Sequence, residues 1–221
     1  VQLDEVASPV ILAWRLAHTP CCRNRQTGDL WLTDNKASSG HGSARSNNLD
    51  GAVDHTTALQ EFDPTLLVER AMRFLILRGP VTAQERWEEN SGYSPSTLAQ
   101  IIAATACAAD LASERQDVQA AEFLWDYADW MVASLERWTV TDCGELVAGL
   151  PKHYVRITPA QPQPGCICAD PNTSQLQIAN GGGMHAARNV VDAGFLQLVR
   201  LGIKPADDPI IVDSIAVVDF V

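Results

Sequence analysis

Residues 94–112 restrict the fold of this chain more than any other stretch. The stretch opens with Ser94 and Pro95, a capping residue and a proline at the first helical position. Small and apolar side chains then follow on nearly every face of a helix. A helix that is apolar on most faces must be buried among other elements. The sequence therefore predicts an inner helix here, with the rest of the chain packed around it.

Five more stretches have the apolar spacing of a helix, and no run of alternating residues predicts a long strand. Residues 117–137 carry carboxylates opposite an apolar face, which predicts an outer helix at the rim of the structure. Residues 63–78 start with Asp-Pro and stop at Gly-Pro. The remaining helical stretches are 3–17, 186–201 and 207–221.

The alternation of inner and outer helices predicts an all-α fold. Paired in chain order, the six stretches form three helical hairpins, about half of an (α/α)6 barrel, which is an α/α toroid. On the pattern alone, a closed bundle of six helices is the favoured alternative. We expect a single partial (α/α) domain over residues 1–221, with a long loop insertion at about 19–60. Turn signals in residues 140–185 predict a second loop with a small β-hairpin.

The composition excludes several kinds of partner. The 221 residues hold 16 Lys and Arg against 27 Asp and Glu, a formal net charge of −11, which argues against nucleic acid and anionic membranes. The longest uncharged run, residues 90–109, contains Gly, Pro and Gln and predicts a buried helix, not a membrane span. Scattered histidines and cysteines without zinc spacing predict no metal and no cofactor, and leave the redox state of the cysteines open.

The most unusual cluster is the string QERWEEN at residues 84–90, in the loop before the inner helix. A carboxyl group beside Trp87 in a half-dry pocket would have a raised pKa, which suits a general acid. The indole offers a flat surface for a sugar ring. This pattern suggests glycoside chemistry. On composition alone the string is also typical of a solvated turn in which Arg86 pairs with an acid.

The string at 84–90 is flanked by two further motifs, GPVT at 79–82 and SGYSPSTL at 91–98. Together with QERWEE at 84–89 they resemble the acid-bearing segment of bacterial glucoamylases and glucodextranases, glycoside hydrolase family fifteen. Other stretches agree in order: QLDEVA at 2–7, HYVRI at 153–157, VDAGFL at 191–196 and ADDP at 206–209. The resemblance covers nearly all of the chain outside about 19–60.

The resemblance implies an enzyme that releases glucose from the non-reducing ends of α-glucans with inversion at the anomeric carbon. In that family the Glu directly after the Trp is the general acid, which gives this role to Glu88. The resemblance also places Trp87 and Glu89 in the subsite for the terminal glucose and Gln2 in the lining of the cleft. It implies an α-glucan or maltooligosaccharide substrate and a secreted or periplasmic location, although the chain shows no signal segment and starts without methionine.

The catalytic base of the family has no match in this chain. An inverting reaction needs a second carboxylate roughly 6.5–9.5 Å from the acid, so we expect only part of the machinery here. The inner helices of a half-ring would have open apolar flanks, for which the missing half-barrel or a second copy is the expected partner. The alternatives are a non-catalytic helical carbohydrate-binding or interaction module, and a broken gene product with neither function. The preference for α-1,4 or α-1,6 linkages and the oligomeric state stay open.

Overall fold

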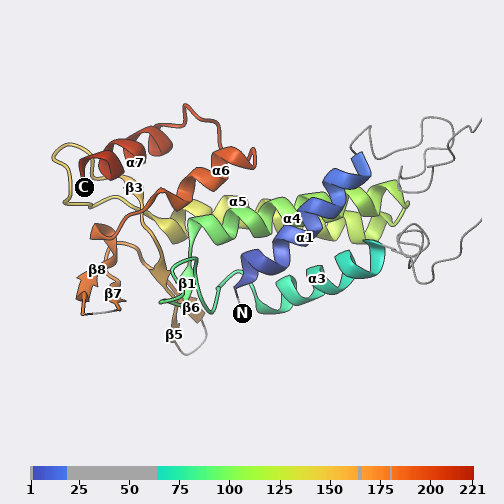
Figure 1. Ribbon diagram of the computed structural model, residues 1–221, viewed down its shortest axis with the longest axis horizontal. Coiled ribbons are helices and arrows are strands. Elements are labelled where there is room, and N and C mark those ends of the chain that lie inside the picture. Colours follow the sequence, from blue (N-terminus) through green and yellow to red (C-terminus); the bar gives the residue numbers. More distant parts are fainter. Residues whose placement is uncertain (1, 19–63, 164–165, 180) are drawn as a thin grey trace, which may run out of the picture.

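The structure, a computed structural model, describes residues 2–18, 64–163, 166–179 and 181–221 (Figure 1). The expected loop insertion at about 19–60 lies outside these residues. The helices are α1 (Leu3–His18), α3 (Pro64–Arg78), α4 (Pro95–Glu114), α5 (Val118–Thr139), α6 (Leu196–Arg200) and α7 (Pro209–Phe220). The strands are β1 (Gly92–Tyr93), β2 (Val140–Thr141), β3 (His153–Tyr154), β4 (Thr158–Pro159), β5 (Gln161–Gln163), β6 (Cys166–Cys168), β7 (Gln175–Ile178) and β8 (Gly183–Ala186).

Helix α4 is the centre of the fold, as the sequence predicts. It packs against α1, α3, α5 and α6, and in Figure 1 it runs beside α5 with α1 crossing it. Leu98, Ile101 and Ala104 on this helix are completely buried. α4 is long and apolar enough to cross a membrane, but 67% of that window is buried inside the structure. Its apolar surface is therefore used for contacts with the neighbouring helices, as in a core helix.

Two of the three predicted hairpins are present. α1 packs against α3, and α4 packs against α5. One face of α5 is exposed to solvent, as expected for an outer helix, while Leu124, Met131 and Leu135 face the core. α7 begins at the predicted Asp-Pro start, where the Asp208 side chain accepts hydrogen bonds from the backbone of Ile210 and Ile211.

The predicted helix at 186–201 is wrong over most of its length. Its first part is the end of β8 and a 3₁₀ turn, Ala187–Asn189, and only Leu196–Arg200 is α-helical. The reason is Asp192, which is extended and accepts a hydrogen bond from the backbone of Gly194, so a new 3₁₀ turn starts there. A Cβ at Gly194 would lie 3.2 Å from the Cβ of Ser96, because this turn presses directly on the start of α4.

The segment after α5 holds short antiparallel strand pairs where a single small hairpin was expected. The described residues form four two-stranded sheets: β1 with β4, β2 with β3, β5 with β6, and β7 with β8. Residues far apart in the chain meet in the first of these, where Tyr93 pairs with Thr158. This pairing lays residues 153–159 against the loop that leads into α4.

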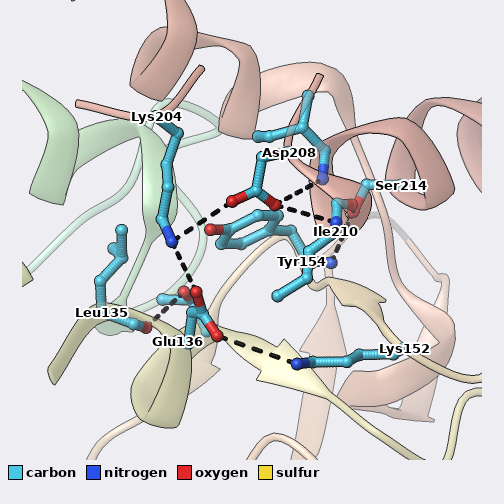
Figure 2. Close-up of polar contacts among 10 residues, drawn as sticks. Leu135, Glu136, Lys152, Tyr154, Lys204, Asp208, Ile210 and Ser214 are labelled. Atoms are coloured by element: carbon cyan, nitrogen blue, oxygen red, sulfur yellow. Dashed lines mark hydrogen bonds and ion pairs between the residues drawn. The ribbon is translucent and has the colours of Figure 1, made fainter. Parts of the chain in front are cut away.

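A cluster of polar contacts fixes strand β3 between α5 and α7 (Figure 2). The backbone N–H of Tyr154 donates to the Ser214 hydroxyl on α7 at 2.9 Å. Beside them, the Lys204 ammonium pairs with Glu136 at 2.5 Å and with Asp208 at 3.5 Å. Both carboxylates hold the pKa of Lys204 above its ordinary value, against the opposing effect of burial. Strand β3 is thus tied to α7, next to ion pairs that link α5 with the start of α7.

Candidate active site

The site is built on a closed loop, residues 82–92, between α3 and α4. Its two ends are joined by a pair of backbone hydrogen bonds, Thr82 N to Gly92 O at 2.9 Å and Gly92 N to Thr82 O at 3.0 Å. Gly92 is required here because a Cβ would lie 2.2 Å from the Thr158 carbonyl oxygen. The loop therefore leaves from a fixed stem that is pressed against β4.

Inside the loop, the buried carboxylate of Glu85 organises the turn. Its side chain accepts a hydrogen bond from the Trp87 backbone N–H at 2.8 Å, and its backbone binds both Asn90 O and the N–H of Glu88. Burial raises the pKa of Glu85, while the Trp87 N–H and the Arg156 guanidinium oppose the rise. Burial beside Trp87, which the sequence led us to expect for the acid, is thus found at Glu85.

Glu88 has a left-handed backbone conformation, with φ of 60°. Such a conformation costs a residue with a side chain about 1–2 kcal/mol, and it persists where surrounding contacts enforce it, which is common at functional sites. Here the Glu88 N–H is held by the Glu85 carbonyl at 2.7 Å. The turn displays the Glu88 carboxyl on the surface, exposed among the described residues.

The structure brings the four predicted site residues together at this loop. The Gln2 amide at the start of α1 donates to Glu88 Oε1 at 3.2 Å. Trp87 lies within the turn, directly before Glu88, with 56% of its surface exposed, and Glu89 lies half-buried directly after Glu88. The contact between Gln2 and Glu88 joins parts of the chain that are 86 residues apart.

Two charged residues at this site were not assigned a role from the sequence. Arg156, 8% exposed, lies 3.2 Å from Glu89 Oε2 and 3.8 Å from Glu85 Oε1. Asp192 accepts a hydrogen bond from the Trp87 indole N–H at 2.7 Å. Both residues lie in stretches that carry the family resemblance, but nothing in their spacing indicates these contacts.

Among the cavities lined by described residues, three of about 300, 380 and 320 Å³ lie along the helices, and none of their lining residues belongs to the loop 82–92. Within the described ranges, no group of three or more His, Cys, Asp or Glu side chains is placed to hold a metal ion.

Comparison with known proteins agrees with this arrangement. The model of the family described as "Glycosyl hydrolases family 15" matches residues 1–219. A glucoamylase from Clostridium sp. (strain G0005) is 40% identical over 154 residues, which are 69% of this chain and 20% of that protein. The crystal structure of a bacterial glucoamylase complexed with acarbose matches with a TM-score of 0.69 and 32% identity, over 99% of this chain and 25% of that one.

The structural match shows that this chain is a mainly helical part of an α/α toroid of the glycosidase type. The chain belongs to glycosyl hydrolases family 15. It spans 20% and 25% of the lengths of these two relatives. The toroid, not the closed six-helix bundle, is thus the architecture of the described helices.

Proposed function

We propose that this chain is part of an inverting glycoside hydrolase that releases glucose from the non-reducing ends of α-glucans, with Glu88 as the general acid. The observation that supports this most is the contact of Gln2 with Glu88 on a turn that forces Glu88 into a left-handed conformation. The acarbose complex of the similar bacterial glucoamylase supports a maltooligosaccharide-like substrate.

In this proposal each side chain has one task. The Gln2 amide donates to Glu88 Oε1, so the proton that Glu88 passes to the glycosidic oxygen is carried on Oε2. The exposed Trp87 indole supports the apolar face of the terminal sugar, and Glu89 accepts hydrogen bonds from its hydroxyls. A second carboxylate, roughly 6.5–9.5 Å from the acid, would activate the attacking water, and we expect it outside residues 1–221.

Apolar side chains on α1 and α7 support a partner for this chain. Leu12, Ile215 and Phe220 are exposed, at 57%, 38% and 70% of their surfaces. We propose that a further part of the same family domain, or a second copy of the chain, covers them. Together with that part, residues 1–221 would form a single catalytic domain, in a secreted or periplasmic protein.

A second candidate is a helical carbohydrate-binding module without catalysis. The exposure of Glu88 among the described residues favours it, because a general acid works best where water is excluded. Trp87, Glu89 and Gln2 would then bind sugar and leave it unchanged.

Glucose release from maltose distinguishes the two, measured for the chain and for the complete gene product that contains it. Glu88→Gln should lower kcat by about 10²- to 10⁴-fold and leave the binding of acarbose within a few-fold of wild type. Glu122→Gln, an exposed carboxylate on α5, is the matched control and should change neither. Binding without turnover in the wild type would support the module, and equal turnover in Glu88→Gln and wild type would refute the role of Glu88.

A further inference from the structure

We propose that Arg156 is a positioning residue of this site. Its guanidinium pairs with Glu85 and Glu89, the carboxylates on either side of Trp87 and Glu88, and so fixes the loop on which Trp87, Glu88 and Glu89 meet the sugar. This inference rests on the function proposed above, and it adds a residue to which the family resemblance gives no role.

The contacts place Arg156 under the loop, with little freedom to move. One guanidinium nitrogen lies 3.2 Å from Glu89 Oε2 and 3.8 Å from Glu85 Oε1. The side chain of Arg156 is 9% exposed, that of Glu85 1% and that of Glu89 20%. The ion pairs are therefore largely shielded from water, so they are screened much less than pairs on the surface.

Arg156 can position the loop because its own backbone is fixed. The N–H of Arg156 donates to Val190 O at 2.8 Å. Two residues earlier, Tyr154 is bound to Ser214 on α7 (Figure 2), and its ring stacks on Phe195 with the centroids 5.7 Å apart. Two residues later, Thr158 pairs with Tyr93. The backbone is thus fixed on both sides of Arg156, which limits where its guanidinium can lie.

The chemistry of the guanidinium suits this task. It is planar and always charged, and its Nη2 donates a hydrogen bond to Glu89 Oε2 at 3.2 Å while it forms an ion pair with Glu85 Oε1 at 3.8 Å. Since its hydrogen bond uses only Oε2 of Glu89, Oε1 of that carboxylate remains for a sugar hydroxyl. A lysine would keep the charge but carry it on a flexible stem, so the direction of the hydrogen bond to Glu89 would no longer be fixed by a planar group.

A purely structural role is the alternative, because removing one partner of a buried ion pair leaves an uncompensated charge and destabilises the fold. Two variants distinguish the roles. Arg156→Lys keeps the charge. Arg156→Met combined with Glu85→Gln removes the unpaired charge at Glu85, so it should recover stability lost in Arg156→Met alone. Arg188→Met, which breaks the ion pair with Glu145 at 3.1 Å, is the control for loss of an arginine outside the site.

The measurements are kcat and KM for maltose, acarbose affinity by titration calorimetry, and unfolding in urea, all on the same preparations. Misplaced groups cost about 10²-fold in rate, so Arg156→Lys and the double variant should lose about 10- to 100-fold in kcat/KM and about 10-fold in acarbose affinity while remaining folded. Arg188→Met should match the wild type in both.

Wild-type kcat/KM and affinity in Arg156→Lys, or in the double variant, would overturn the proposal. If the wild type binds acarbose but releases no glucose, the catalytic function fails and the affinity measurement alone decides the role of Arg156. If the wild type neither binds acarbose nor releases glucose, both proposals are wrong.

Discussion

Replacing Gly92 by alanine tests whether the stem of the loop 82–92 is as tight as the structure shows. A Cβ at this position would lie 2.2 Å from the Thr158 carbonyl oxygen and 3.0 Å from a side-chain carbon of Ile157. Because an ordinary contact between carbon and oxygen is about 3.3 Å, two backbones must separate by roughly 1 Å. That movement opens the stem and the pairing of β1 with β4.

The expected cost follows from the contacts that are lost. Crowding of this kind costs about 1–3 kcal/mol. The pair of backbone hydrogen bonds between Thr82 and Gly92 adds about 0.5–1.5 kcal/mol for each bond that breaks. Gly92→Ala should therefore lower the free energy of unfolding by about 2–6 kcal/mol if both bonds break. It should also lower acarbose affinity, because Trp87 and Glu89 lie on the loop that the stem holds.

Gly202→Ala is the matched control. Gly202 also has a positive φ, 76°, but a Cβ there would meet nothing within 4 Å, so the change should cost only about 1–2 kcal/mol of backbone strain and leave binding intact. Urea unfolding and titration calorimetry on both variants decide the matter. If Gly92→Ala is no less stable than Gly202→Ala and binds acarbose like the wild type, the close approach of Gly92 to β4 is not real.

Two further predictions concern the buried acid and the exposed helix faces. Burial raises the pKa of Glu85 above its ordinary value of 4.5. The stability that the protonated Glu85 contributes is therefore complete below pH 4.5 and is lost as the pH rises through the folded-state pKa. In urea unfolding, Glu85→Gln should lose less stability than wild type between about pH 4.5 and 7, and identical slopes of unfolding free energy against pH would contradict this. The isolated chain should elute as an oligomer or bind a hydrophobic dye, because Ile215 and Phe220 are exposed on α7; a compact monomer without dye binding in chromatography with light scattering would count against a partner surface.

Most of the helices could be predicted from the sequence because each carries its own local signals. α4 is apolar on most faces, and α3 and α7 both begin at an Asp-Pro pair. The stretch 186–201 could not be assigned correctly, because its apolar residues follow no rule that separates a helix from extended chain packed on a core. The local structure of this stretch is decided by the side chain of Asp192, which caps a new 3₁₀ turn.

The site was predictable only where its residues are contiguous. Trp87, Glu88 and Glu89 stand in one string, and the resemblance added Gln2. Arg156 and Asp192 reach the same loop across 67 and 105 residues of chain. Such contacts depend on the pairing of β1 with β4 and on the turn after Asp192, neither of which has a signal in local periodicity.

The buried pairing of Glu85 with Arg156 also constrains how descendants of this chain can change. Loss of Arg156 alone leaves the buried Glu85 carboxylate without a cation, at a cost of up to about 3–5 kcal/mol, which is a large part of the stability of an ordinary domain, whereas loss of Glu85 alone leaves Arg156 paired with Glu89. Lineages that lose Arg156 should therefore have replaced Glu85 as well. We expect the two positions to covary among natural homologues, as a single inherited unit.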